Sequence, residues 1–439
     1  MKRALALLIL LSFASIALAQ DASSFAGDWI ITSDIFGYPD YNRLVLKVEG
    51  GKLTGNLNGT AAEVTVAGSE IHITVKHPNS TEEYVGALSG ANLSGNFTHT
   101  PKNDPPEHYR WTAERLPAPH AGPPQRHDFT PTRFEREFSQ RLKPVLTVSP
   151  GDTIHTTTVD AGGADEKGVT RVLGGNPETG PFYIVGAMPG DVLAVHFTRI
   201  QLNRDYAVSD DSLVGRAMGP GLAVKMKDVG KNVRWRLDRQ RGVATSMEPG
   251  EHLKDFTVPL KPMLGCVATA PGSFQAPIIA GDSGRFGGNM DFNQINEGAT
   301  VYLPVSVPGA LLYVGDGHAA QGDGELNGNA LETSMDVEFT VNVLPRKSII
   351  GPRVENDTHI MAVGLGGSLD DALHVATASL VQWLEQDYAL KPSEIAQVLG
   401  TSVEYSIGEL ADRNAAIIAK LRKSSLSTLP KPQPEAPKP

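Results

Sequence analysis

Hydrophobic and polar residues alternate in short runs over residues 21–117. Examples are Leu44–Val48, Glu70–Val75 and Asn92–Phe97, with turn-forming pairs such as Asn58-Gly59 between the runs. An alternation with a period of two, broken by turns at intervals of roughly 8–14 residues, is typical of an antiparallel meander. The pattern therefore predicts a small antiparallel β domain in this part of the chain.

This first domain shows no gathering of residues of catalytic type, so we interpret it as an accessory or packing domain. Its opening at Gly27-Asp28-Trp29 and its close at Tyr109–Arg115 resemble those of small secreted β-barrels of the lipocalin type. The proline-rich stretch 118–125 comes next. It is expected to be a semi-extended linker that forms no core.

The pattern changes over residues 126–428. Val145–Val148, Val192–Ile200 and Val301–Val305 are predicted strands, and Asp205–Glu251 is predicted to be a long insertion or a flap over a site. The chain contains 45 glycines and 31 prolines, which is high for a helical protein and favours a turn-rich β architecture. The second domain is therefore predicted to be mainly β.

Helical spacing of apolar residues occurs only near the end of the chain. Leu369–Gln386 has this spacing and Ser368 is placed to cap it, and further helices are predicted over Lys391–Val398 and Ile407–Leu421. These elements predict a smaller α/β portion at the C-terminus. Residues 429–439 are rich in proline and are predicted to form a disordered tail.

The N-terminus and the charge narrow the function classes. Basic Lys2 and Arg3, an apolar run and Ala17-Leu18-Ala19 predict a signal peptide over 1–19 that is cut after Ala19. We expect a periplasmic or secreted protein without a membrane anchor. The formal net charge of -10 argues against nucleic acid or an anionic membrane as the main partner. The sole cysteine, Cys266, excludes intramolecular disulfides, and its apolar neighbours favour a buried small residue over a nucleophile.

The stretch 309–332 is the strongest candidate for a site. An apolar run stops there at a cluster of functional residue types spaced by glycines: Asp316, His318, Gln321, Asp323 and Glu325. A strand that ends in a glycine-bent loop can turn several short polar side chains toward one point. Asp160 and Asp291 also stand where predicted strands meet glycines, and Gly288 lies in a tract that lets backbone approach a ligand. We expect these elements to share one pocket.

These residue types favour metal-assisted hydrolysis. The sequence has no Gly-x-Ser-x-Gly elbow and no plausible cysteine nucleophile, whereas Asp and His on glycine loops suit a borderline or hard divalent cation. The predicted ligands are His318, Asp160 and Asp291, and Asp316 either binds the metal or orients His318. Glu332 is expected either to contact and orient the metal ligands without binding the metal itself, or to be exposed to solvent.

Five motifs, in order over residues 126–421, resemble the acetamidase/formamidase family: Asn176–Pro181, Ala187–Asp191, Gly287–Asp291, Tyr302–Val305 and Gly315–Glu325. The resemblance implies β-sandwich or barrel-like halves with a smaller α/β portion. It also implies hydrolysis of short amides to carboxylate and ammonia, a divalent metal (zinc, sometimes calcium) and a homo-oligomer, a dimer or tetramer. The expected substrate is a small amide such as formamide or acetamide.

Roles for individual residues follow under this resemblance. Glu325 is the predicted general base, and Asp323 is a second catalytic candidate that could instead bind metal. Asn176 and Gln321 are placed to donate hydrogen bonds to the amide oxygen. The competing hypothesis is a non-catalytic, exported β module that binds calcium through the acidic loop. Calcium would not require His318, so that residue separates the two hypotheses.

Overall fold

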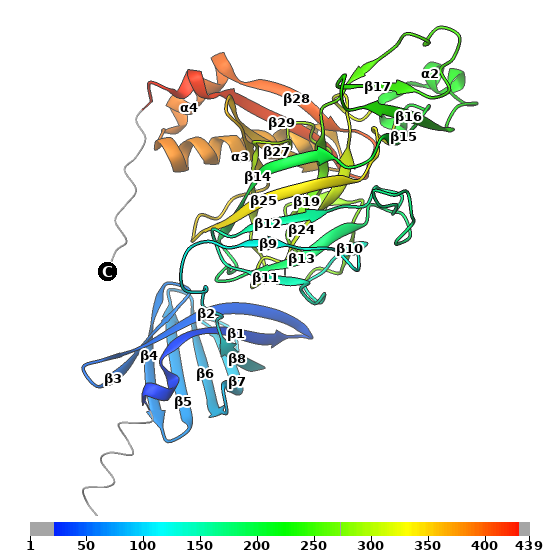
Figure 1. Ribbon diagram of the computed structural model, residues 1–439. Coiled ribbons are helices and arrows are strands. Elements are labelled where there is room, and N and C mark those ends of the chain that lie inside the picture. The colour runs from blue at the N-terminus through cyan, green and yellow to red at the C-terminus, as the bar shows by residue number, and fades with distance from the viewer. Residues whose placement is uncertain (1–21, 273, 430–439) are drawn as a thin grey trace, which may run out of the picture. The chain divides into compact units, whose positions relative to one another are not determined.

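The computed structural model describes residues 22–272 and 274–429 (Figure 1). The chain divides into two compact units with a boundary at Ala118, and each unit has its own hydrophobic core. The predicted signal peptide and residues 430–439 of the predicted tail lie outside the described residues. Among the described helices, none is long and apolar enough to cross a membrane.

The N-terminal unit is a closed antiparallel barrel of eight strands, in which β1 pairs with both β2 and β8. The predicted antiparallel domain is thus confirmed. Its strands are β1 (Gly27–Ile35), β2 (Tyr38–Glu49), β3 (Lys52–Leu57), β4 (Thr60–Ala67), β5 (Glu70–His77), β6 (Ser80–Ser89), β7 (Asn92–Pro101) and β8 (Glu107–Arg115).

Large apolar side chains fill the interior of the barrel. Trp29, Tyr84 and Trp111 are each at most 1% exposed, and the indole N–H of Trp111 donates to the carbonyl of Asn96 at 3.1 Å. The period-two pattern places these residues on the inner face while polar neighbours point outward. Pairing of the buried indole N–H removes the cost of an unsatisfied donor. The barrel is therefore a packed core.

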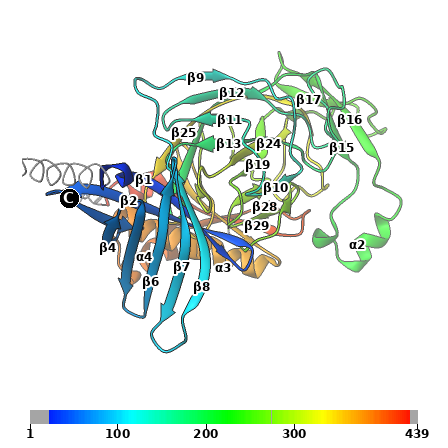
Figure 2. The ribbon, with the colours of Figure 1, turned by 90° about the horizontal axis from the view of Figure 1, so that it is seen from below.

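Two sheets build most of the C-terminal unit (Figure 2). One has six strands in the order β11-β13-β24-β19-β22-β21, and the other has nine in the order β28-β29-β27-β26-β23-β14-β25-β12-β9. The six-stranded sheet comprises β11 (Leu146–Val148), β13 (Glu178–Ile184), β19 (Met263–Ala268), β21 (Ser283–Gly284), β22 (Gly287–Asn289) and β24 (Leu312–His318). The nine-stranded sheet comprises β9 (Arg126–Asp128), β12 (Thr153–Thr157), β14 (Val192–Leu202), β23 (Thr300–Pro304), β25 (Met335–Leu344), β26 (Arg353–Glu355), β27 (His359–Gly366), β28 (Glu404–Glu409) and β29 (Ala415–Arg422).

A single core joins the two sheets. Phe182 of β13 and Phe339 of β25 belong to the same buried cluster, and their rings meet edge to face with centroids 5.8 Å apart. Sheets that face each other across interdigitated apolar side chains form a sandwich. The mainly β prediction is confirmed, and a short pair of strands, β10 (Glu137–Phe138) and β20 (Ile278–Ile279), completes this part.

Helices pack on one end of the nine-stranded sheet. The predicted helix at Leu369–Gln386 is α3 (Leu369–Tyr388), and Ser368 accepts the backbone N–H of Asp371 as its cap. The helix predicted to start at Lys391 is α4 (Pro392–Ser402). Ala376, Leu380 and Leu384 of α3 share a core with β27 and β29. A short 3-10 helix, η2 (Lys423–Leu426), follows β29.

The third predicted helix, Ile407–Leu421, is wrong. This segment forms the end of β28, a turn and β29, which pair in antiparallel fashion. Residues Ala415–Ala419 of β29 are all buried, so both faces of the strand are apolar. A strand that is buried on both faces loses its alternation and cannot be told from a helix by periodicity. The hairpin also contributes acidic residues to the site described below.

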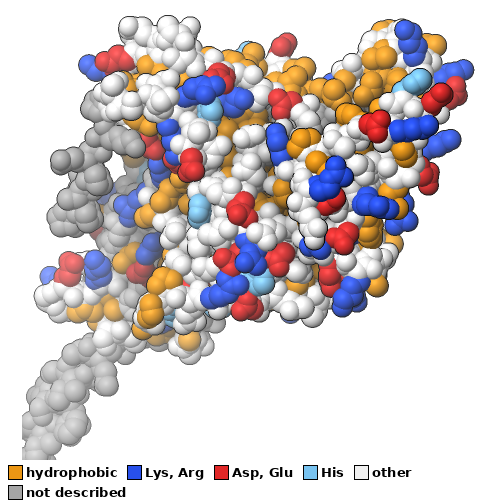
Figure 3. All heavy atoms as spheres, turned by 45° about the horizontal axis from the view of Figure 1, so that its top comes forward, with side chains coloured by type: hydrophobic (Ala, Val, Ile, Leu, Met, Phe, Trp, Pro, Cys, Tyr) orange, Lys and Arg blue, Asp and Glu red, His pale blue; other side chains and the backbone are white. Residues whose placement is uncertain are grey.

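The predicted insertion at Asp205–Glu251 forms most of a four-stranded sheet. Its strands are β15 (Tyr206–Asp210), β16 (Asn232–Asp238), β17 (Val243–Ser246) and β18 (Val258–Pro259), with η1 (Gly215–Ala217) and α2 (Pro220–Lys225) between β15 and β16. On the face of the molecule in Figure 3, acidic and basic side chains are interspersed with hydrophobic ones.

The predicted linker at 118–125 is held to the C-terminal unit by one buried carboxylate. Asp152 accepts hydrogen bonds from the backbone N–H groups of Ser149 and Gln125, at 2.9 and 2.7 Å. The rings of His120 and His127 approach the same carboxylate with Nε2 at 2.8 and 3.0 Å. Burial acts to raise the pKa of Asp152, but these hydrogen bonds outweigh it and hold the pKa well below its usual value. The segment is therefore docked through polar contacts.

Candidate functional site

The end of β24 supplies two side chains to a buried cluster. Asp316 and His318 are two residues apart on this strand, so they point to the same face of the sheet, and both are at most 2% exposed. Asp316 has a φ of 52°, a left-handed conformation that bends the strand at this point. The bend therefore lies at Asp316 itself, whereas Gly315 and Gly317 on either side leave room for the side chains of Glu178 and Met335.

Asp291 reaches the same place from the loop after β22. It has a φ of 42°, and its backbone N–H donates to the carbonyl of Gly265 on β19 at 3.1 Å. A Cβ atom on Gly265 would collide with the carboxylates of both Asp291 and Asp316. Only glycine at this position therefore lets the two carboxylates lie over the strand.

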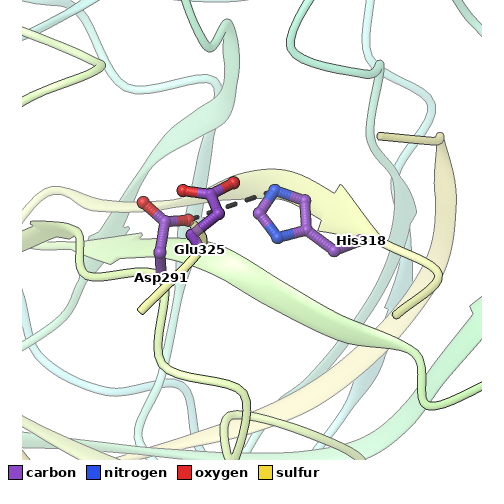
Figure 4. A group of neighbouring side chains, drawn as sticks. All are labelled: Asp291, His318 and Glu325. Carbon is purple, nitrogen blue, oxygen red and sulfur yellow. Dashed lines mark ion pairs between the residues drawn. The ribbon is translucent and has the colours of Figure 1, made fainter. Parts of the chain in front are cut away.

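The loop after β24 folds back and closes the cluster. Ala319 and Leu331 are hydrogen-bonded through their backbones at 2.8 Å, and His318 and Glu332 form an isolated bridge. Glu325, in the bend of the loop, accepts the backbone N–H of Ala330 at 2.8 Å. Figure 4 shows the carboxylates of Asp291 and Glu325 turned toward the imidazole of His318.

His318 lies at the centre of these carboxylates. Its Nε2 is 3.2 Å from Glu332, 3.3 Å from Asp316 and 4.0 Å from Asp291. Although the distances are short, Nε2 makes no well-directed hydrogen bond to any of them. The atom instead points into the space that the carboxylate oxygens share.

Gln321 fixes the tautomer of His318. The amide nitrogen of Gln321 donates to the backbone carbonyls of Asp291 and Gly408, so its oxygen must face His318. That oxygen is 2.9 Å from Nδ1 of His318, which is therefore the protonated nitrogen. In the neutral ring, Nε2 then carries the lone pair that can bind a cation.

The carboxylates of the cluster lack the charge partners that burial normally requires. In the described chain, no Lys or Arg forms an ion pair with Asp291, Asp316, Glu325 or Glu332. Oxygen atoms of Asp291, Asp316 and Glu332 are buried without any hydrogen-bond partner. Burying unpaired carboxylates costs several kcal/mol per ion, about the penalty that a bound cation removes.

The pKa values reflect this crowding. Burial raises the pKa of Glu325 to about 8 and that of Glu332 to about 7, although the charge of His318 acts in the opposite direction. Burial, followed by the charge of Glu325, raises the pKa of Asp291 well above its ordinary value. For His318, burial acts to lower the pKa, but the charges of Glu332 and Asp316 outweigh it and raise the pKa.

The C-terminal hairpin adds a second acidic group. Glu409, at the end of β28, is fully buried and has one carboxylate oxygen without a partner. Asp412, in the turn of the hairpin, accepts the side-chain N–H of Asn289 at 2.8 Å, and the same amide also donates to Asp291. Burial raises the pKa of Glu409 to about 8 and that of Asp412 to about 6.

The donor sets fit divalent cations. Three groups of side chains bring their ligand atoms within 4.8 Å of one another: Asp291, His318 and Glu325; Asp316, His318 and Glu332; and Asp291, Glu409 and Asp412. Imidazole with carboxylates suits zinc and related cations, whereas a set of oxygens alone suits calcium. Each of the three groups could therefore hold a metal ion.

A model of the acetamidase/formamidase family matches residues 278–418, the part of the chain that contains Asp291, His318, Glu325 and Glu332. This part of the C-terminal unit is similar to the acetamidase/formamidase family. The resemblance that the sequence motifs carry is therefore confirmed, and the family implies hydrolysis of an amide C–N bond.

Solved structures agree with this family. The chain is 27% identical to a predicted acetamidase/formamidase from Thermoanaerobacter tengcongensis, with a TM-score of 0.60 over 70% of this chain and 98% of that one. An acetamidase from Bacillus halodurans is 27% identical, with a TM-score of 0.59 over 69% and 99% of the two chains. A formamidase candidate from Schizosaccharomyces pombe is 54% identical over 59 residues, a match that spans 13% of this chain and 14% of that protein.

Of the residues predicted from the sequence, the structure of the C-terminal unit brings together Asp291, Asp316, His318, Gln321 and Glu325. Asp160 lies outside the three groups. Its carboxylate pairs with the buried guanidinium of Arg204 at 2.6 Å. Asp323 is exposed and accepts a hydrogen bond from Asn293 at 2.8 Å, away from the cluster.

The remaining predicted residues lie around the cluster. Asn176, in a left-handed conformation, donates to Asn289 at 3.0 Å and lines the same pocket as Asp160 and Glu332. Gly288 has a φ of 97°, and a Cβ there would strike the backbone of Asp282, so its role is to fit β22 against its neighbour. Cys266 is buried, as predicted.

Sequence reasoning did not assign Glu178, Glu409 and Asp412 to the site. Glu178 starts β13, is 1% exposed, and has both carboxylate oxygens unpartnered, and burial and then the charge of Asp316 raise its pKa. It lies in the motif Asn176–Pro181, which was the available signal. Glu409 and Asp412 were assigned to a helix, which hid the fact that they are on a hairpin beside Asp291.

Proposed function

We propose that this protein is an exported, metal-dependent amidase that hydrolyses short linear amides to a carboxylate and ammonia. The observation that carries the proposal is the buried arrangement of His318 among carboxylates with unpartnered oxygens. Similarity to the acetamidase/formamidase family supports the reaction class. Export rests on the signal peptide expected from the sequence, with periplasmic or secreted location.

His318, Asp316 and Glu332 would hold a divalent cation, with zinc the best fit to this donor set, and Asp291 and Glu325 complete the second group around the same imidazole. A bound cation of this kind lowers the pKa of water and polarises an amide carbonyl. Gln321 keeps Nδ1 of His318 protonated, which leaves Nε2 free for the cation. A homo-oligomer, as the family resemblance implies, belongs to the same proposal.

Glu325 is the proton carrier in this proposal. Its carboxylate faces His318 and Asp291, and its one described hydrogen bond, from the backbone of Ala330, holds one oxygen and orients the other. A glutamate whose pKa lies near neutrality can take a proton from the attacking water and deliver it to the leaving nitrogen. Burial gives Glu325 such a pKa, about 8.

A calcium ion is the second candidate cation, and one observation favours it. Asp291, Glu409 and Asp412 form a group with oxygen donors only, which suits a hard cation. In the alternative function, a non-catalytic calcium module, this group alone would matter and His318 would have no part. The placement of His318 in two of the three groups supports the amidase.

Release of ammonia from formamide, acetamide and longer amides tests the proposal, with metal content measured on the same samples. We expect Glu325→Gln to retain metal and to lower kcat by roughly 10²–10⁴-fold, the usual contribution of a positioned proton carrier. His318→Ala should lose both activity and zinc. Asp323→Asn, from the same loop but exposed, is the matched control and should keep activity.

Turnover unchanged in both Glu325→Gln and His318→Ala, with metal retained, would contradict the assignment of the site. Absence of turnover on every amide, combined with calcium as the only bound metal, would favour the calcium module.

A further inference from the structure

A pocket lies beside the inserted sheet and shares one residue, Glu332, with the cluster. It has a volume of about 680 Å³, and Glu332 forms part of its wall together with Asp160, Asn176 and Tyr206. Pockets of roughly 300–1,000 Å³ hold ligands of drug size. Formamide and acetamide have only three and four non-hydrogen atoms, so this pocket is built for a longer molecule.

The inserted sheet is hydrogen-bonded directly to Glu332. Val208 of β15 and Glu332 exchange two backbone hydrogen bonds, of 2.9 and 3.1 Å. On the other side of β15, Val208 is paired with Arg234 of β16. Directly opposed residues of antiparallel strands point to the same face. Glu332, Val208 and Arg234 therefore form one row across the sheet, and all three line the pocket.

The acidic groups of the pocket are already engaged. Asp160 pairs with Arg204, whose side chain also donates to the carbonyl of Glu332 at 3.2 Å. The carboxylate of Asp210 accepts the side-chain N–H of Asn329 at 2.6 Å. Glu332 itself belongs to the cluster around His318. The charge of Asp160 is thus balanced by Arg204, that of Glu332 would be balanced by the bound cation, and Asp210 has a neutral amide as its partner.

Arg234 is the only basic side chain among the described residues that line the pocket, and it has no anionic partner. Its guanidinium lies 5.1 Å from the ring centroid of Tyr206, which orients it, and no ion pair or side-chain hydrogen bond of the described chain involves it. An arginine held in this way presents a planar fork of donors that matches a carboxylate. The rest of the lining adds neutral donors from Asn176, Asn232 and Asn329.

We infer that the substrate is a primary amide whose acyl chain ends in an anionic group, such as the monoamide of a dicarboxylic acid, and that Arg234 binds this group. The inference rests on the proposed amidase function and specifies its substrate class. Water replaces the amide nitrogen at the carbonyl next to Glu332, which gives a dicarboxylate and ammonium. The distal carboxylate is unchanged and serves only to position the molecule.

The row also sets the length of the acyl chain. Neighbouring strands are about 4.8 Å apart, so the backbones at Glu332 and Arg234 are separated by roughly 10 Å. Both side chains stand on the same face of the sheet, at the two ends of this interval. Both are long enough to reach a molecule that lies between them, so we expect an acyl chain of about four to six carbon atoms, counted from the amide carbon to the distal carboxylate.

The experiment compares kcat/KM for succinamate, glutaramate and adipamate with that for neutral amides of the same length, in the metal-loaded full-length protein. Wild type should prefer the anionic member of each pair. Arg234→Gln should lower kcat/KM for the anionic amides about ten-fold, as expected for a charged hydrogen bond at a partly open site, and should leave the neutral amides within about two-fold. Arg236→Gln, on the same strand but lining a separate pocket, is the matched control and should change neither.

A charge reversal provides the second variant. Arg234→Glu should reverse the preference, so that an amide with a terminal ammonium group, such as 6-aminohexanamide, becomes the better substrate. Hydrolysis of neutral amides with no preference for the anionic ones, or a preference that survives Arg234→Gln and Arg234→Glu, overturns this inference and leaves the amidase proposal intact. Failure to hydrolyse any amide would instead count against the amidase proposal.

Discussion

The two units of the chain differ in the polar and charged side chains that they bury. In the described part of the N-terminal unit, Ser33 is the only buried polar residue, and the core consists of apolar and aromatic side chains. The C-terminal unit buries Asp291, Asp316, Glu325 and Glu409, several of them with unpartnered oxygens. The first unit thus gains stability from its buried apolar side chains, whereas the buried carboxylates of the second unit lower its stability.

Burial in the barrel stabilises the fold, whereas burial of the carboxylates in the C-terminal unit serves the proposed site. A closed barrel needs only period-two alternation and a filled interior. The cluster around His318 needs carboxylates from β24, from the loop after β22 and from the loop that closes at Glu332. Such a concentration of like charge persists only where the surrounding sheets over-determine it, and its cost is offset when a cation binds.

The largest effect is expected from the barrel core. Trp111→Ala removes a fully buried ring and its hydrogen bond to Asn96, which should lower the unfolding free energy of the N-terminal unit by about 3–5 kcal/mol. Because the cores share no residues, the second calorimetric transition and ammonia release should be unchanged. Phe36→Ala, at a ring that is 83% exposed, is the control. Loss of activity in Trp111→Ala would show that the units are energetically coupled.

Removal of the metal should act on the other unit alone. Dialysis against a chelator should lower the Tm of the C-terminal unit, because the carboxylates around His318 then repel one another. Adding back zinc at a hundred times its Kd should restore about 2.7 kcal/mol. The barrel transition is the internal control. A Tm of the C-terminal unit that does not respond to chelation and zinc would argue against the cluster as a metal site.

The smallest effect concerns the docked segment 119–127. Asp152→Asn should cost about 1–3 kcal/mol, because several donors lose a charged acceptor. The lowered pKa of Asp152 means that its stabilisation is present above the ordinary carboxyl pKa of about 3.9 and is lost as pH falls toward the folded value. The pKa of His120 is raised by its hydrogen bond to Asp152, so its stabilisation is present below about pH 6.5 and is lost as pH rises through the folded value.

Amide hydrogen exchange of residues 119–127 measures this pH dependence. Exchange in the wild type should be slowest between these two limits, and Asp152→Asn should abolish the minimum. Glu338, which forms a partly exposed ion pair with Arg126, offers a comparison in Glu338→Gln, for which little change is expected. A minimum that persists in Asp152→Asn would mean that other contacts dock the segment.

The sequence predicts the barrel well because its signals are local. Turns such as Asn58-Gly59 and the alternation along β4 or β5 lie within a few residues of one another. The same local pattern failed at β29, since Ala415–Ala419 are buried on both faces and the strand looks like a helix. The order of strands in the two large sheets joins distant segments and could not be predicted from local pattern.

For the site, the sequence predicted the residues of one dense loop and Asp291, and missed Glu178, Glu409 and Asp412, which come from other parts of the chain. Asp316, His318 and Glu325 are close together in the sequence, so glycine spacing was enough to find them. Asp160 has the same local appearance, but its partner Arg204 is 44 positions away and takes up its charge. Glu409 comes from a hairpin some 80 residues beyond Glu325, and only the folded sheet brings the two together.

The hairpin of β28 and β29 has a bearing on when the protein can become active in the cell. Gly408 supplies a carbonyl that orients Gln321, and Glu409 and Asp412 stand beside Asp291. A chain that the ribosome has extended only to Ser402 contains His318 and Glu325 but lacks these groups. The order of synthesis therefore delays assembly of the proposed reactive centre until the chain has been extended beyond Asp412.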